Sequence, residues 1–358
     1  MLVYIFVVLF PFLVGKLYKN KLVRLGVQNN DIRIKKLRWK YVFWAALPMF
    51  FLIAFRNQSI GADTGMYIRS FIRIDETSWS TVFEKETMEK GYIVFVKLIG
   101  FFTNNPLVYQ CICAVIYLLS ISFFLNELED NQFFVLFLFG TLGMYIFMFT
   151  GVRQCLAISI CLLSYRFIKN RRLIPFILIV YLATCFHKSA IIFIAAYLLY
   201  PLSLSLGSVF VYIPITVVAS YYLEELQYWF NHQLDYAYEI EGEAGGFVFS
   251  VIVILMTIFT LFIVLGNNKV TKYSQGLINI GFIAALFWVL RISTRTAERP
   301  SFYFLIFTFA SFAHAISSLK TTKERVLVKM MVIILSLAVF LYRLLNQMDF
   351  WPYSFYSN

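Results

Sequence analysis

The chain has 358 residues, of which 61% are hydrophobic and only 14% are charged, so it has too little polar surface for a water-soluble globule. Its net charge of +12 comes from basic residues that lie between apolar runs, a pattern that argues against a nucleic-acid-binding domain. Lipid is therefore its expected solvent. Because backbone groups in hydrocarbon must be paired within their own segment, the chain is predicted to be an all-α polytopic membrane protein.

Apolar runs follow one another along the chain and predict about twelve transmembrane helices in a single transmembrane domain, residues 1–358. The predicted spans are 2–15, 41–55, 107–125, 133–150, 153–168, 173–186, 189–206, 207–222, 247–265, 277–291, 301–318 and 330–346. An outer loop, residues 56–106, contains a shorter apolar segment, 91–102. This segment carries Lys97, so we interpret it as a re-entrant or interfacial helix and not as a further span.

Basic residues assign the two faces of the membrane. Nine lie between Lys16 and Lys40, and ten more lie in the segments 166–172, 269–272 and 320–329, which are therefore expected in the cytoplasm. Counting the spans places all these segments on one side and both chain ends on the other. The same count places the acidic loop 126–132 in the cytoplasm. Its acidic residues do not contradict this placement, because they carry little weight in the charge rule.

Cations on the outer face run against this bias and need a specific reason. Snorkelling to lipid headgroups explains any single one of them. The alternative is an anion site, because Arg153, the His187–Lys188 pair and Arg299 stand where inward-running helices are predicted to begin. Unpaired N–H groups and the helix dipole favour an anion there, which suggests a phosphate or diphosphate site.

Two further observations extend this site. Arg291, Arg295 and Arg299 recur every fourth residue, which would align them on one helical face up to Pro300. Arg56, after the second span, is also predicted outside. Because the planar guanidinium suits phosphate oxygens, five arginines are candidate diphosphate ligands: Arg56, Arg153, Arg291, Arg295 and Arg299.

Three residues on the outer face are candidate general bases: Asp63, Glu89 and His187. Each has a structural alternative, because a lone His or carboxylate near a helix end is often a cap or a hydrogen-bonded group. The residues by themselves do not choose among the three.

A second outer loop, 223–246, contains six acidic residues and no Lys or Arg. Its aromatic residues, which include Tyr228 and Trp229, have the polar tips expected of a platform for sugar rings. An aromatic belt at the membrane interface explains them equally well.

Four motifs, in this order along the chain, resemble the EpsG family of bacterial exopolysaccharide polymerases, which is related in function to the Wzy-type O-antigen polymerases. The motifs are FRNQSIGADTGMY from Phe55, EKGY from Glu89, GVRQ from Gly151 and FHKSA from Phe186. A fifth stretch, RTAERPSFYF from Arg295, is similar to an arginine-then-tyrosine element of that family. Thr64 follows Asp63 where the family often has a bulkier residue, a departure expected to affect sugar specificity.

The resemblance implies a GT-C-like polymerase that joins repeat units carried on undecaprenyl diphosphate, at the outer face of the bacterial cytoplasmic membrane. Donor and acceptor would both be lipid-linked, with a flippase and a chain-length regulator as possible partners. The arginines would hold the diphosphate and one base would suffice, so we expect inversion at the anomeric carbon without a metal or cofactor. The residues expected to contact substrate are Thr64, Tyr67, Gln154, Lys188, Tyr228 and Trp229.

Three other functions remain open at this point. A flippase or other transporter often shows two related halves with charges near the midplane, and neither feature is evident here. An O-antigen ligase would use the same donor with a different acceptor, and nothing in the sequence excludes it. A membrane acyltransferase would use a catalytic histidine, and the clustered arginines argue against it.

Overall fold

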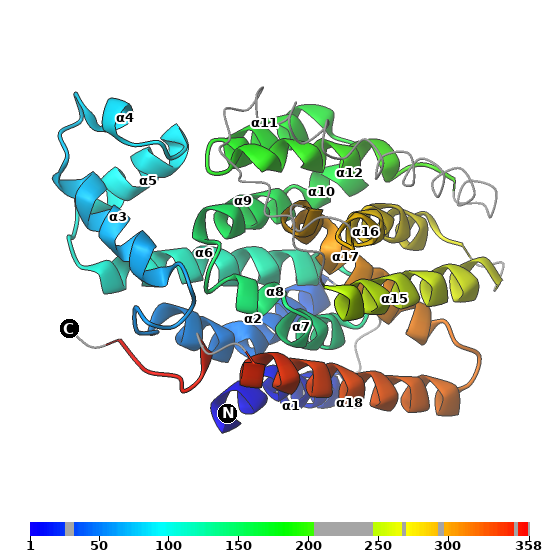
Figure 1. Cartoon of the computed structure of the whole chain (residues 1–358). Helices are drawn as coiled ribbons and strands as arrows, with labels where there is room; N and C mark the ends of the chain where they lie inside the picture. The colour runs from blue at the N-terminus through cyan, green and yellow to red at the C-terminus, as the bar shows by residue number, and fades with distance from the viewer. Residues whose placement is uncertain (26–31, 204–245, 267–269, 293–296, 347–349, 357–358) are drawn as a thin grey trace. The chain divides into compact units, whose positions relative to one another are not determined.

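The computed structural model describes residues 1–25, 32–203, 246–266, 270–292, 297–346 and 350–356. These ranges contain helices, turns and one isolated backbone bridge, between Arg56 and Phe355, which confirms the predicted all-α class for this part of the chain (Figure 1). The residues fall into two compact units. The first comprises 1–166, 174–191 and 327–358, and the second comprises 167–173 and 192–326.

Seven helices within the described ranges are long and apolar enough to cross a membrane, which confirms a polytopic membrane protein. They are α1 (Leu2–Leu25), α2 (Ile32–Ala54), α6 (Pro106–Glu127), α15 (Phe247–Gly266), α16 (Lys272–Leu290), α17 (Glu298–Ser317) and α18 (Thr322–Asn346). Each corresponds to one predicted span, although α1 and α2 continue well beyond the apolar runs into the basic segment between them.

Shorter helices occupy four other predicted spans, so the count of twelve stays a prediction. The span 153–168 is divided into α9 (Val152–Leu163) and α10 (Tyr165–Lys169), and the segment 173–186 contains α11 (Leu173–Thr184). The span 189–206 begins as the 3₁₀ helix η1 (Lys188–Phe193) and continues as α12 (Ile194–Leu199). The span 207–222 lies outside the described residues.

A glycine breaks the predicted span 133–150 into α7 (Gln132–Thr141) and α8 (Met144–Phe147). Gly143 has φ +92°, in the left-handed region that favours glycine. A Cβ at this position would lie only 2.4 Å from Nη1 of Arg343 on α18. The hydropathy of this segment predicts one continuous helix, and this prediction is wrong. The chain turns at Gly143, between α7 and α8.

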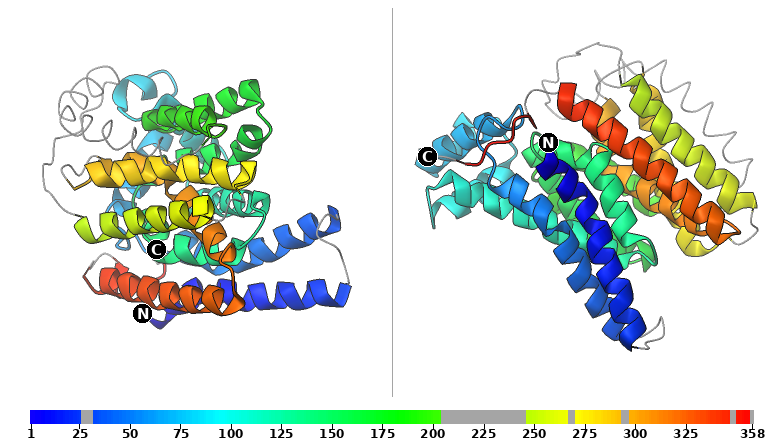
Figure 2. Two further views of the ribbon diagram at one scale, coloured as in Figure 1. Left: turned by 90° about the vertical axis from the view of Figure 1, so that its right-hand side faces the viewer. Right: turned by 90° about the horizontal axis from the view of Figure 1, so that it is seen from below.

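The first unit is built around α2, which packs against α1, α6 and α7, while α6 also packs against α9. Helices α1 and α2 lie side by side as a hairpin (Figure 2). Val8, Leu125 and Phe137 are completely buried in this bundle.

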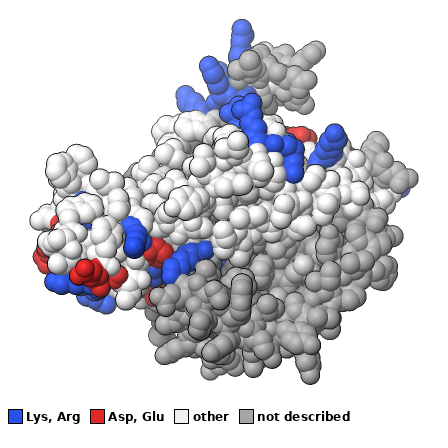
Figure 3. Space-filling model, turned by 90° about the horizontal axis from the view of Figure 1, so that it is seen from above, with Lys and Arg blue, Asp and Glu red and all other residues white. Residues whose placement is uncertain are grey.

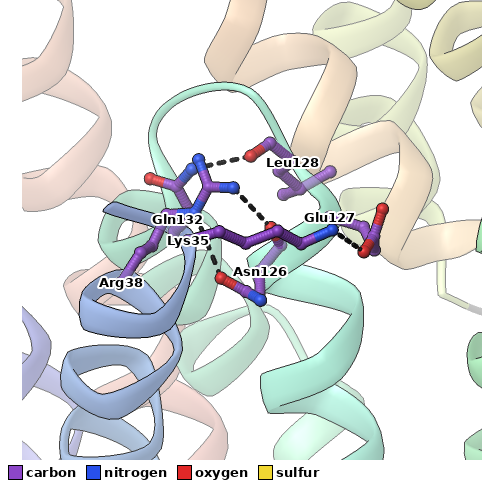
Figure 4. Close-up of polar contacts among 6 residues, drawn as sticks. All are labelled: Lys35, Arg38, Asn126, Glu127, Leu128 and Gln132. Atoms are coloured by element: carbon purple, nitrogen blue, oxygen red, sulfur yellow. Dashed lines mark hydrogen bonds and ion pairs between the residues drawn. The ribbon is translucent and has the colours of Figure 1, made fainter. Parts of the chain in front are cut away.

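Polar contacts join three segments at one end of the first unit. Lys35 pairs with Glu127, and the Arg38 guanidinium donates to the Asn126 side-chain and backbone oxygens, at 3.2 and 2.7 Å (Figure 4). Lys329 of α18 donates to Asn131 at 2.7 Å. The acidic loop 126–132 thus lies at the same end as the basic segment of α2, as the span count predicts. That this end faces the cytoplasm stays a prediction.

Both chain ends lie at the opposite end of this unit. The Tyr4 hydroxyl donates to the Phe350 carbonyl at 3.0 Å, and the Tyr356 N–H donates to the Phe55 carbonyl at 2.7 Å. The last described residues therefore run beside the turn that follows α2.

A small helical lobe lies between α2 and α6 in the sequence and contains α3 (Thr64–Glu76), α4 (Val82–Lys85) and α5 (Lys90–Gly100) (Figure 1). In α3, Ile68, Phe71 and Ile74 recur every third residue and are buried, while Arg69 and Arg73 are exposed. Helix α5 is the predicted apolar segment of the outer loop. Its 11 residues are about 16 Å long, too short to cross a bilayer.

In the second unit, α16 packs against α15, α17 and α12. Gly281 allows α16 to approach α17 closely, because a Cβ there would lie 2.8 Å from the Thr308 backbone nitrogen. The Thr308 hydroxyl donates to the Gly281 carbonyl at 2.9 Å. The Asn279 side chain donates to the Leu199 and Leu202 carbonyls at 2.8 Å each, so a buried amide closes the end of α12.

Candidate functional site

Glu89 is the centre of a buried polar cluster in the first unit. It directly precedes α5 and is only 8% exposed. Its carboxylate forms an ion pair with Arg153, lies 3.1 Å from Nδ1 of His187, and accepts from the Lys188 backbone N–H at 3.3 Å. The motifs EKGY, GVRQ and FHKSA, about 30 to 60 residues apart in the sequence, therefore meet at one carboxylate.

The glycine of the EKGY motif permits this meeting. A Cβ at Gly91 would lie 2.6 Å from both the Cβ and the carbonyl oxygen of Cys185, which follows the end of α11. The next residue, Tyr92, donates its backbone N–H to that carbonyl at 3.2 Å. The start of α5 is thus pressed against residue 185, which brings Glu89 next to His187.

Helix starts carry the cations, as the sequence predicts. Arg153 is the second residue of α9, Lys188 is the first of η1, and Arg299 is the second of α17. Arg153 is partly exposed, and its buried Nε has no hydrogen-bond partner among the described residues. Its neighbour Gln154 is 3% exposed and faces the interior of the unit.

Tyr67 contributes to the cluster from α3. Its side chain is 5% exposed and hydrogen-bonded to Arg153. Burial raises the pKa of Tyr67, and Arg153 opposes this rise without cancelling it, so the phenol stays neutral. The Tyr67 ring meets Tyr92 edge-on at 6.3 Å, and the Tyr92 hydroxyl pairs with Tyr109 at 2.7 Å. Tyr67 is thus hydrogen-bonded to Arg153 and packed against the buried tyrosines Tyr92 and Tyr109.

Arg56 and Thr64 form a structural joint. Arg56 is 3% exposed, donates from Nε to the Thr64 hydroxyl at 3.0 Å and to the Ile53 carbonyl, and lies over the Phe149 ring. The Thr64 hydroxyl lies 2.9 Å from the Phe149 carbonyl and is itself 1% exposed. Gly61, with φ +86°, completes the turn. The FRNQSIGADTGMY motif therefore ties the outer loop to the segment that leads into α9 and Arg153.

Electrostatics separate the roles of the candidate bases. Burial would raise the pKa of Glu89, but the His187 hydrogen bond and the Arg153 charge outweigh it and lower the pKa to about 2. A carboxylate this acidic is a poor proton acceptor near neutral pH. Asp63 holds the N-cap position of α3 without a side-chain capping bond, outside this set of contacts. The geometry therefore favours His187 as the base and Glu89 as the group that orients it.

The tautomer of His187 follows from this contact. A ring that donates from Nδ1 to Glu89 carries its lone pair on Nε2, so Nε2 is the atom able to accept a proton. The carboxylate would then stabilise the imidazolium that forms. This is the base-and-orienter arrangement found in many acid–base sites.

The second unit contains the remaining arginines. Arg291 caps the end of α16 and donates from Nε to Glu298 at 2.9 Å, while Arg299 is exposed in the first turn of α17. Because α16 ends at Leu290 and α17 begins at Glu298, the spacing of four does not reflect one continuous helix. Pro300 lies in the first turn of α17, where a missing N–H is tolerated.

Other predicted site residues fall outside the described ranges. They are Arg295 and, in the acidic aromatic loop, Tyr228 and Trp229. Within the described ranges, no three His, Cys, Asp or Glu side chains lie close enough together to hold a metal ion.

Sequence reasoning treated Glu89 as one of three competing bases and missed its bridging position. The signal was the EKGY motif itself, since a glycine two residues after a carboxylate at a helix start indicates close backbone approach. It also missed Glu298 as the partner of Arg291.

Comparison with known proteins identifies one family. The family model described as the EpsG family matches residues 39–355. No curated protein and no solved structure is similar enough to this chain to be a match. The matched range includes every residue of the Glu89 cluster.

Proposed function

Since this chain belongs to the EpsG family, whose members are membrane proteins of the polysaccharide-polymerase type, we propose that it polymerises a bacterial surface polysaccharide. The substrates are oligosaccharide repeat units linked to undecaprenyl diphosphate, and the reaction takes place at the outer face of the cytoplasmic membrane. The single observation that carries this proposal is the Glu89 cluster, where one carboxylate holds a histidine and an arginine at two helix starts.

The cluster has the groups that glycosyl transfer needs. A hydroxyl oxygen of the acceptor attacks the anomeric carbon of the donor and forms the new C–O bond. The bond from the anomeric carbon to the diphosphate oxygen breaks, and undecaprenyl diphosphate leaves with the electron pair. Nε2 of His187 takes the hydroxyl proton, and Glu89 stabilises the resulting imidazolium. Arg153, at the N-terminus of α9, stabilises the negative charge on the leaving group.

This assignment keeps some predicted roles and changes others. Tyr67 becomes a positioning residue for Arg153, and Arg56 with Thr64 holds the loop in place. Lys188, half-buried beside His187, is a proposed contact for the diphosphate or the sugars. The diphosphate roles of Arg291, Arg295 and Arg299 stay predictions from the sequence. One base and direct displacement give inversion. We expect activity to survive a chelator, and activity that is lost with EDTA and restored by Mg²⁺ would contradict the mechanism.

A deletion strain's glycan profile tests the function. Surface glycan limited to single repeat units indicates a polymerase. Lipid-linked polymer without surface glycan would instead indicate an O-antigen ligase, and repeat units trapped in the cytoplasm would indicate a flippase.

Variants then test the site. Arg153→Ala and His187→Ala should each insert normally, yet fail to restore polymer. Arg73→Ala is the matched control, because Arg73 also pairs with a glutamate in the outer lobe, Glu86, through two bonds of 2.6 and 2.8 Å. Polymer of normal length from Arg153→Ala, at normal protein level, would refute the role of the cluster.

A further inference from the structure

The end of α5 exposes an unusually apolar tip. Phe101 and Phe102, directly after the helix, are each 83% exposed, and Leu98 on its last turn is 56% exposed. The two phenyl rings meet each other edge-on, at 5.2 Å between centroids. Aromatic side chains this exposed beside one another indicate an interaction surface.

The tip is held firmly, so its exposure is not a consequence of a loose chain end. Lys97 on the last turn of α5 donates to the Asp75 and Thr77 carbonyls, at 2.8 and 2.7 Å. Gly100 packs so closely on α3 that a Cβ there would lie 1.8 Å from Oδ1 of Asp75. Helix α5 is therefore fixed to the end of α3, and the residues that follow this contact, Phe101 and Phe102, remain exposed.

The chain path places the tip at a membrane boundary. Only Thr103, Asn104 and Asn105 separate Phe102 from Pro106, the first residue of the membrane-spanning helix α6. Asn105 caps that helix by accepting from the Leu107 N–H at 2.9 Å. Phe102 and Pro106 are four residues apart, which separates them by at most about 14 Å, so the tip lies close to the level at which α6 enters the bilayer.

Lys97 and Asp75 lie at the base of the tip, and most of the exposed charges of the lobe belong to α3 and α4. Arg69, Arg73, Glu76, Glu84 and Lys85 are exposed on α3, α4 and their connections. In Figure 3, acidic and basic side chains gather along one edge of the lobe that holds α3 to α5, and the opposite edge is almost free of charge. This segregation is typical of a segment lying in a membrane interface, with one side in water and the other in lipid.

We propose that Leu98, Phe101 and Phe102 form an anchor that inserts into the outer-leaflet lipid surface, making α5 an interfacial helix and not a re-entrant one. Lys97 cannot travel into hydrocarbon, because its ammonium is committed to two carbonyls of the lobe. The occupant of the surface is phospholipid, since the membrane-spanning helix α6 that follows also exposes apolar side chains, Val108, Val115 and Leu119, and the tip itself carries no charge for a protein partner.

The anchor also has a consequence for the Glu89 cluster, and this step rests on the proposed function. Helix α5 begins immediately after Glu89 and ends at the tip, so the cluster lies at most about one helix length, 16 Å, from the lipid surface. A diphosphate linked to a membrane-embedded isoprenoid is found at that surface. The anchor thus sets the height of the catalytic groups above the bilayer.

Site-specific photocrosslinking in nanodiscs of phosphatidylethanolamine and phosphatidylglycerol tests the anchor. A benzoylphenylalanine probe replaces Phe101, Phe102 or, as control, Glu84 on the charged side of the lobe. Intact-mass spectrometry after irradiation should show phospholipid adducts at positions 101 and 102, at least about tenfold more abundant than at position 84. Equal lipid adducts at all three positions, adducts to a second copy of the chain, or none at 101 and 102 would each overturn the proposal.

A functional readout keeps the two proposals distinguishable. Phe101→Ser combined with Phe102→Ser should abolish the lipid contact of the tip and slow polymerisation, while leaving the Glu89 cluster intact. Lipid adducts at 101 and 102 with unchanged polymerisation in the double variant would uphold the anchor and reject its role in setting the height of the site. Loss of polymer in Arg153→Ala does not depend on this result.

Discussion

Gly91→Ala is the most informative single change, because it alters only the distance between α5 and the segment that carries His187. The new methyl group would lie 2.6 Å from the Cβ and the carbonyl oxygen of Cys185, whereas ordinary contact begins at 3.4 Å. Neither atom is the end of a flexible side chain. The two segments must therefore separate by about 0.8 Å.

This displacement is enough to break the central contact. The distance from Oε1 of Glu89 to Nδ1 of His187 would increase from 3.1 Å to about 3.9 Å, beyond hydrogen-bonding range. Losing a hydrogen bond to a charged group lowers the free energy of unfolding by about 1.5–3 kcal/mol. The higher helix propensity of alanine offsets about 0.5–1 kcal/mol of this loss. A misplacement of this size in a catalytic group lowers the rate by about 100-fold.

The assay compares polymer formation by Gly91→Ala with that of a matched glycine change. Gly266→Ala is the control, because no atom lies within 4 Å of a Cβ built there. Both variants are expressed in the deletion strain, their membrane levels are measured by immunoblotting, and polymer is followed on glycan gels. We expect normal polymer from Gly266→Ala and short or no polymer from Gly91→Ala. Full-rate polymerisation by Gly91→Ala at normal level would refute the reasoning that close approach at residue 185 aligns the site.

Three further changes probe the same cluster. Glu89→Gln keeps the shape but removes the charge that orients His187 and pairs with Arg153, so polymerisation should fall by about 100-fold or more, measured as initial rate in nanodiscs. Tyr67→Phe removes one hydrogen-bond partner of Arg153 and should slow the reaction by about 10- to 100-fold without lowering protein level. Because the pKa of Glu89 is lowered to about 2 in the folded protein, its carboxylate stabilises the fold above pH 4.5, and this contribution is lost as the pH falls towards 2.

Each of these outcomes has a matched comparison. For the pH dependence, the stability difference between wild type and Glu89→Gln in detergent should be at most about 3 kcal/mol at pH 6 and should shrink between pH 4.5 and 2. A difference that is constant over that range would show that folding does not lower the pKa of Glu89. Undiminished activity of Tyr67→Phe would show that Arg153 does not need the Tyr67 hydrogen bond. Wild-type rates for Glu89→Gln would show that the Glu89 charge does not orient His187.

Parts of the site were predictable because they depend on local sequence. Arg153, Lys188 and Arg299 lie at helix starts, where the boundaries of the apolar runs predict them. The pairing of the 126–132 loop with the basic end of α2 also follows from counting spans. These features are set by hydropathy and chain direction, which a sequence displays directly.

The roles of individual side chains were less predictable. Arg56 reads from the sequence as one more outer cation, yet its guanidinium is buried against Thr64, the Ile53 carbonyl and the Phe149 ring. Arg291 reads as part of an arginine stripe, yet it caps a helix beside Glu298. A residue's partners lie far away in the chain, so its burial and charge balance depend on contacts that spacing does not encode.

The sequence by itself determined that this protein is a membrane protein of the EpsG type, because apolar composition excludes water as its solvent and short motifs persist in order along the chain. Only the tertiary structure decided which residues act together. The close approach of Gly91 to Cys185 brings three distant motifs to one carboxylate, and the low pKa of that carboxylate is the reason that we propose His187 and not Glu89 as the base. Close backbone packing and electrostatic coupling are properties of the folded chain, and they bring together charges that the sequence predicts only to share one membrane face.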